Sequence, residues 1–237
     1  EELPDPVAAA QGEAARAHLA EALEAGDADG AAAAAAEIRI ETGDPSDVVA
    51  RLAEELDVDL LVLGPHRARP LEEAHAGGTL ERIVRAVLRP CLLVAQEPAG
   101  PYARVLCGVD LSPAAAAAIR AAGRVAPDAA LTAFHAVHIP RLGFFGHVGG
   151  PNDPFVKEAR AELRRWAEAE ALEPRTPEIR IVEGSVHHAY DRLLHEIAPD
   201  LLAVGAHGRA TLSPTLLGGF ARRMIYEPPC DVLIVRR

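Results

Sequence analysis

Residues 201–219 read LLAVGAHGRATLSPTLLGG, a buried apolar run followed by glycines in the order G-x-x-G-x9-G-G. The same layout occurs 141 positions earlier, where residues 60–78 read LLVLGPHRARPLEEAHAGG, with Arg67 in place of the second glycine. Glycine after a buried strand lets backbone N–H groups approach a phosphate closely, whereas arginine blocks that approach and resists positive φ. The sequence therefore predicts a duplicated nucleotide-binding fold with at most one good site.

Composition restricts the class of protein. The 237 residues and the internal repeat predict two domains, and the net charge of −11 argues against a nucleic-acid partner, which would require a basic face. The three cysteines have no C-x-x-C spacing, which favours buried free thiols in a reducing compartment. No stretch approaches the ~18 consecutive apolar residues of a membrane helix. We expect a cytoplasmic protein without membrane or nucleic-acid partners.

The second half alternates strand and helix patterns throughout. Strands are predicted at 104–109, 131–137, 178–183, 200–204 and 232–235, and helices at 114–124, 155–171, 186–197 and 216–227. Alternation of this kind requires crossover connections, which give a parallel sheet with helices on both faces. The fold class predicted is α/β, with a doubly wound, Rossmann-like, five-stranded sheet.

The first half shows only the later part of that order. Helices are predicted at 8–25, 46–56 and 79–88, and strands at 36–41, 58–63 and 91–95. Nothing corresponds to the first strand, first helix and second strand of the other half, and the chain begins with Glu rather than Met. We therefore expect a longer natural protein with two tandem sheets, the first copy incomplete here: domain one at 1–96, a linker at 97–103 and domain two at 104–237.

The ordered set of motifs resembles the universal stress protein family over almost the whole chain. In the second half the motifs are VLCGVDLS (105–112), FHAV (134–137), EGS (183–185), VGAHGR (204–209), LLGG (216–219) and PCDVLIV (229–235), and in the first half TGDPSD (42–47), LVLGPHR (61–67) and PCLLV (90–94). One such motif would be weak evidence, but the set in this order, repeated at a constant offset, is highly specific.

The resemblance implies ATP, accompanied by Mg²⁺, at the carboxyl ends of the parallel strands, where doubly wound sheets generally bind ligands. It implies that Asp110 lies by the adenosine and that the backbone of Ala136 reads the adenine edge. Gly205 and Gly208 would line the ribose and phosphate path. These roles describe a binding site rather than a catalytic one.

The phosphate end of the implied site departs from the family pattern. Gly218 and Gly219 open a helix and would offer N–H groups to the phosphates. Family members that bind ATP have Ser or Thr at the position of Gly219, and one lost hydrogen bond to a charged group is worth about 1.5–3 kcal/mol. This corresponds to roughly 10- to 150-fold in affinity. We expect binding that is weakened rather than abolished.

The first copy of the loop is expected to hold no ordinary ATP site. Arg67 replaces a glycine, Pro65 removes an N–H donor, and Glu72 and Glu73 add negative charge. The first copy also has two more residues between its glycine loop and its last strand. If those residues belong to the loop, Thr79 rather than Gly77 corresponds to Gly218.

Residue types in the second half suggest two other chemistries. His135 and His138 could suggest a metal site, but strand alternation sends them to opposite faces. Ser112, His207 and Asp110 could suggest a hydrolytic triad, but Ser112 is explained as a helix N-cap before Pro113. Both patterns favour structure over chemistry.

Two surfaces favour association. The closing strands 92–95 and 232–235 are predicted at sheet edges, and family members join such edges between subunits or tandem halves. We expect the two halves to form an intramolecular pseudo-dimer, and further homo-oligomerisation is plausible on the same grounds. Segment 142–146, with its aromatics, is either a lid over the site or a subunit contact.

The leading hypothesis is a stress-response protein that binds ATP in its C-terminal half and acts through conformation or association rather than catalysis. The alternatives are a dimeric scaffold protein that has lost nucleotide binding, and a weak ATPase.

Overall fold

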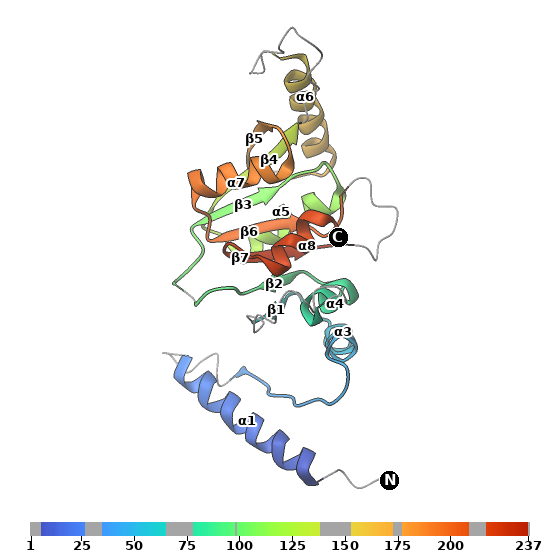
Figure 1. Ribbon diagram of the computed structural model, residues 1–237, viewed down its shortest axis with the longest axis vertical. Helices are drawn as coiled ribbons and strands as arrows, with labels where there is room; N and C mark the ends of the chain where they lie inside the picture. Colours follow the sequence, from blue (N-terminus) through green and yellow to red (C-terminus); the bar gives the residue numbers. More distant parts are fainter. Residues whose placement is uncertain are drawn as a thin grey trace. The chain divides into compact units, whose positions relative to one another are not determined.

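The computed structural model describes residues 6–26, 35–64, 78–97, 99–137, 153–172, 177–208 and 217–236 (Figure 1). The chain forms two compact units, Glu1–Val48 and Val49–Arg237. In the first unit, helix α1 spans Pro6–Gly26, as predicted for 8–25. Helix α3, Pro45–Glu55, begins in the first unit and ends in the second.

The second unit is built on one seven-stranded sheet of order β1-β2-β7-β6-β3-β4-β5. The strands are β1 Leu61–Leu63, β2 Cys91–Leu93, β3 Arg104–Gly108, β4 Ala130–Val137, β5 Glu178–Glu183, β6 Leu201–Gly205 and β7 Asp231–Val235. The five strands of the second half are all parallel to one another, which confirms the predicted doubly wound sheet.

Helices cover both faces of this sheet, as the alternating pattern predicted. They are α4 Thr79–Ala86, α5 Pro113–Val125, α6 Pro154–Ala169, α7 Val186–Ile197 and α8 Gly219–Tyr226. Buried side chains of α4, α7 and α8 form one core cluster, and those of α5 and α6 form the other. Successive strand residues alternate between the two clusters, Leu106 in the first and Cys107 in the second, because side chains of a strand point to opposite faces.

The two halves of the chain share the sheet through their closing strands. β2 and β7 pair antiparallel, with Cys91 opposite Ile234 and Leu92 opposite Leu233. This confirms the expectation that the closing strands pair within the chain. Each of them would otherwise be a sheet edge, and their pairing joins the two halves in one continuous sheet.

Residues on either side of the predicted linker are fastened to the start of β7. Asp231 Oδ1 accepts a hydrogen bond from Ala95 N at 2.8 Å, and Asp231 Oδ2 accepts one from the Tyr102 hydroxyl at 2.6 Å. One carboxylate therefore holds the chain as it leaves β2 and again as it approaches β3. The linker boundaries themselves stay a prediction.

The prediction of a strand at 36–41 is wrong: the structure has no strand there. Its counterpart in the second half, β5, pairs with β4 alone. Among the described residues no strand pairs with residues 36–41. A strand without a neighbour has no partners for its backbone N–H and C=O groups, so the extended pattern does not become a strand.

All three cysteines are buried free thiols, as predicted. Burial raises the pKa of each thiol from 9.0 to about 12. In the part of the chain that the structure describes, no helix is long and apolar enough to cross a membrane.

Candidate functional site

Asp110 lies just beyond the carboxyl end of β3 and is fixed by the start of α5. Its Oδ1 accepts hydrogen bonds from Ser112 N at 3.0 Å and from Ser112 Oγ at 2.6 Å. Ser112 Oγ in turn accepts from Ala115 N at 3.1 Å, which confirms Ser112 as the N-cap of α5. Leu111 between them has φ of 62°, a left-handed conformation that costs an L residue free energy. The turn therefore holds the Asp110 carboxylate in one place.

The second carboxylate oxygen of Asp110 faces Gly208, which follows the neighbouring strand β6. A Cβ on Gly208 would lie 3.1 Å from Asp110 Oδ2. Gly208 therefore leaves the space beside this oxygen open, and an alanine there would press on the carboxylate.

Gly205, the last residue of β6, has a packing role. A Cβ at this position would lie 3.0 Å from the Ala114 carbonyl carbon and 3.0 Å from Ala115 N. The sheet and the first turn of α5 approach so closely that only glycine fits. This accounts for Gly205 without a ligand, and its predicted place on the ribose path stays a prediction.

Gly218 and Gly219 form the N-terminus of α8. Gly218 is the N-cap, with its N–H donated to Ala206 O at 2.8 Å, and its own carbonyl accepts from Arg222 N at 2.9 Å. The N–H groups of the first turn have no acceptor within a helix, and among the described residues no side chain caps them; the turn itself has no acidic residue. A Cβ on Gly219 would meet no described atom within 4 Å, so the described residues leave this end of the helix open. Such an end attracts an anion.

The glycines and the aspartate belong to one region. A Cβ on Gly218 would lie 3.8 Å from Gly208 N, and Gly208 lies beside Asp110. β3 and β6 are adjacent parallel strands, so their carboxyl ends meet at the same edge of the sheet. The structure thus brings together Asp110, Gly208, Gly218 and Gly219; residues 209–216, which connect the two glycine pairs, lie outside the described residues.

Ala136 lies near the carboxyl end of β4, on the other side of β3. Phe134 O accepts a hydrogen bond from Val109 N at 2.9 Å, so the backbone groups of Phe134 face β3. Backbone groups alternate in direction along a strand, so the N–H and C=O of Ala136, two residues further on, also face the β3 side. The β3–β4 ladder ends with Gly108 opposite Phe134, so the Ala136 groups lie beyond the last paired residue of β3. This places a donor and an acceptor at the same edge as Asp110.

His135 Nδ1 lies 2.8 Å from Val109 O, a hydrogen bond that explains this histidine structurally. Within the described residues no group of three or more potential ligands could hold a metal ion. His138 and segment 142–146 lie outside the described residues.

The N-terminus of α4, the first-half counterpart of α8, is closed by side chains. Gly78 caps α4 as Gly218 caps α8, so by cap position neither Gly77 nor Thr79 corresponds to Gly218. Gly78 N donates to the Tyr226 hydroxyl at 3.0 Å, and that hydroxyl donates to Glu81 Oε2 at 2.6 Å.

Glu81 supplies the negative charge that the first turn of α4 requires. It is 4% exposed, and besides Tyr226 it meets Arg222 Nε at 3.2 Å and Arg85 Nη1 at 3.5 Å. The Glu81 charge raises the pKa of Arg222. Sequence reasoning missed this network, although an acidic residue in the first turn of α4 and none in that of α8 was a signal. Pro65, Arg67, Glu72 and Glu73 lie outside the described residues.

The model of the universal stress protein family matches residues 1–95 and again residues 101–236. The chain belongs to the universal stress protein family. Universal stress protein A homolog 1 of Coxiella burnetii is 29% identical over 139 residues, which cover 56% of this chain and 96% of that protein.

Solved structures share the fold at low sequence identity. A putative universal stress protein of Pseudomonas aeruginosa aligns with a TM-score of 0.60 at 17% identity, covering 83% of this chain and 69% of that one. A universal stress protein of Archaeoglobus fulgidus aligns with a TM-score of 0.60 at 20% identity, covering 85% and 68%. These likenesses support the fold alone, and the residue roles rest on the geometry above.

Proposed function

We propose that this universal stress protein binds an adenine nucleotide, ATP with Mg²⁺, in its C-terminal half and acts in the cytoplasm through conformation or association rather than catalysis. One observation carries the proposal: the uncapped N-terminus of α8 opens beside Gly208 and Asp110, whereas the N-terminus of α4 is closed by Glu81 and Tyr226.

The site would divide the nucleotide among three groups of atoms. The N–H of Gly219, at the start of α8, would hold phosphate oxygens with the help of the helix dipole, and Gly218, whose own N–H donates to Ala206 O, would lie beside them as the N-cap. Asp110 Oδ2 would accept a hydrogen bond from the nucleoside, and the backbone of Ala136 would pair with the adenine edge. Because the chain carries a net charge of −11, these local donors rather than the long-range field must attract the phosphates.

Calorimetric titration of ATP into protein stripped of ligand tests this function. We expect a heat of binding and a rise in melting temperature, both reduced in Gly208→Ala, whose Cβ would lie 3.1 Å from Asp110 Oδ2. Gly78→Ala is the matched control, since its Cβ would lie at an ordinary 3.7 Å from the Tyr226 hydroxyl, away from the proposed site. Absence of both heat and stabilisation at millimolar ATP would contradict the proposal.

The open position at Gly219 allows a test in the opposite direction. Gly219→Ser restores the hydroxyl typical of ATP-binding family members, and a Cβ there meets nothing within 4 Å. We expect affinity for ATP to rise roughly 10- to 150-fold, the equivalent of one hydrogen bond to a charged group. An affinity that is unchanged would show that the loop does not contact the phosphates.

A further inference from the structure

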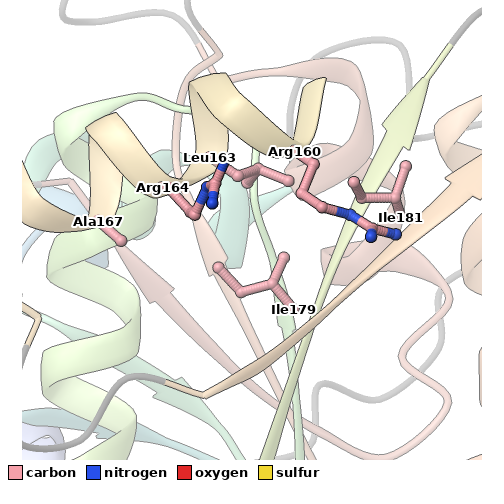
Figure 2. Close-up of a pocket in the computed structure, with 6 residues that line it drawn as sticks. All are labelled: Arg160, Leu163, Arg164, Ala167, Ile179 and Ile181. Carbon is pink, nitrogen blue, oxygen red and sulfur yellow. The ribbon is translucent and has the colours of Figure 1, made fainter. Parts of the chain in front are cut away.

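A second pocket lies between helix α6 and strand β5, with a volume of about 300 Å³ (Figure 2). Its lining residues are Arg160, Leu163, Arg164, Ala167, Ile179 and Ile181. None of them belongs to the candidate nucleotide site. Its volume is at the lower end of the range for small-molecule sites, roughly 300–1,000 Å³.

The floor of the pocket is apolar because of two periodicities. Ile179 and Ile181 are two residues apart on β5 and therefore share the face of the strand toward α6. Leu163 and Ala167 are four residues apart on α6 and share the face toward β5. β5 is an end strand of the sheet, so no described strand lies beyond it.

The rim of the pocket is cationic. Arg160 and Arg164 are one helical turn apart, both exposed, and both line the same hollow (Figure 2). Like charges at this spacing repel each other. Over the ranges that the structure describes, neither guanidinium forms an ion pair, whereas Arg180, on the opposite face of β5, meets Glu178 and Glu196. The pocket thus concentrates positive charge over apolar surface in a chain of net charge −11.

We propose that this pocket binds a medium-chain fatty acid. The carboxylate lies between Arg160 and Arg164, whose planar guanidinium groups match it in geometry and relieve their mutual repulsion on binding it. The acyl chain lies on Leu163, Ile179 and Ile181, which removes its apolar surface from water. A free phosphate would leave the floor unused, and a neutral apolar molecule would leave the two charges unused. The small volume favours a medium rather than a long chain.

Titration with sodium decanoate tests the proposal, by calorimetry and by the emission of Trp166. Trp166 is the single tryptophan of the chain and lies in the same buried cluster as Leu163. We expect decanoate to bind at least tenfold more tightly than decanol, which lacks the charge, and than butyrate, which lacks the chain. Equal binding of decanoate and decanol would overturn the proposal, as would no binding of decanoate.

Three glutamine variants localise the site. Arg160→Gln and Arg164→Gln keep the apolar stem of the side chain and remove its charge, so each should weaken decanoate at least tenfold. Arg165→Gln removes the same charge from the next position of α6, which does not line the pocket, and should bind like the parent. Equal losses in all three would mean non-specific attraction and would overturn the proposal. Melting temperatures confirm that each variant is folded.

This inference is independent of the proposed nucleotide function. Gly208→Ala should bind decanoate as the parent does while its ATP titration is impaired. Loss of decanoate binding in that variant would overturn the assignment to the α6–β5 pocket.

Discussion

Tyr226→Phe removes one oxygen atom from the junction between the two halves of the sheet. The hydroxyl donates to Glu81 Oε2 at 2.6 Å and accepts from Gly78 N at 3.0 Å. A hydrogen bond to a charged group contributes about 1.5–3 kcal/mol. Because Tyr226 is 40% exposed, water can partly replace the lost partners, and because Arg222 still meets Glu81 at 3.2 Å, the carboxylate keeps a partner. We therefore expect a loss of about 1.5 kcal/mol, at the lower end of that range.

Urea unfolding followed by circular dichroism measures this free energy of unfolding. A domain of this size loses about 2–4 °C in melting temperature per kcal/mol, so a fall of roughly 3–6 °C is expected in calorimetry. Tyr190→Phe is the matched control: its hydroxyl is buried and has no hydrogen-bond partner among the described residues. Removing it should leave stability unchanged or raise it, because an unsatisfied buried hydroxyl costs free energy. Equal losses in the two variants, or no loss in Tyr226→Phe, would refute this account of the junction.

Three further outcomes are expected. Gly205→Ala should lower the free energy of unfolding by about 1–3 kcal/mol, because its Cβ would lie 3.0 Å from the backbone of α5. Gly219→Ala should instead leave the free energy of unfolding unchanged or raise it by up to about 1 kcal/mol, since its Cβ would meet no described atom within 4 Å. Equal losses of stability in Gly205→Ala and Gly219→Ala, measured by urea unfolding, would contradict the packing assigned to both glycines. The buried thiols should react with a disulfide reagent at pH 8 only after unfolding. Folding raises the pKa of Cys91, Cys107 and Cys230 from 9.0 to about 12. The free energy of unfolding should therefore be independent of these thiols below pH 9 and fall between pH 9 and 12, by up to about 1.4 kcal/mol per pH unit per thiol. A free energy of unfolding that stays constant between pH 9 and 11 would contradict this.

Local sequence signals predicted most helices and strands of the second half. Ser112 before Pro113 predicted the start of α5, where the structure shows the serine cap. The alternation of strands and helices predicted the parallel sheet, because crossover connections leave few topologies. The strand at 36–41 was predicted wrongly for a physical reason: residue pattern favours an extended conformation, but only a neighbouring strand supplies the hydrogen bonds.

The candidate site was predictable where it depends on sheet topology. Asp110 and Gly208 follow adjacent parallel strands, so their proximity follows from the order of the elements. The contact of Gly205 with the first turn of α5 was not predictable, because it depends on the distance between a helix and a sheet. Nor was the bond from Tyr226 to Glu81, which joins side chains 145 positions apart.

The two halves of the chain differ in the groups that interact with the N–H groups at a helix N-terminus, that of α4 in the first half and that of α8 in the second. N–H groups at such an end favour negative charge and hydrogen-bond acceptors. At α4, Glu81 of its own first turn supplies the charge, and the neutral Tyr226 hydroxyl accepts from Gly78 N. An anionic ligand at α4 would have to displace that hydroxyl and lie near a buried carboxylate, which repels it. Among the described residues neither obstacle exists at α8, because its first turn has no acidic residue and a Cβ on Gly219 would meet no described atom within 4 Å. The same physical requirement is met by contacts between the two halves at α4, and at α8 it is the basis of the proposal that a nucleotide phosphate binds there.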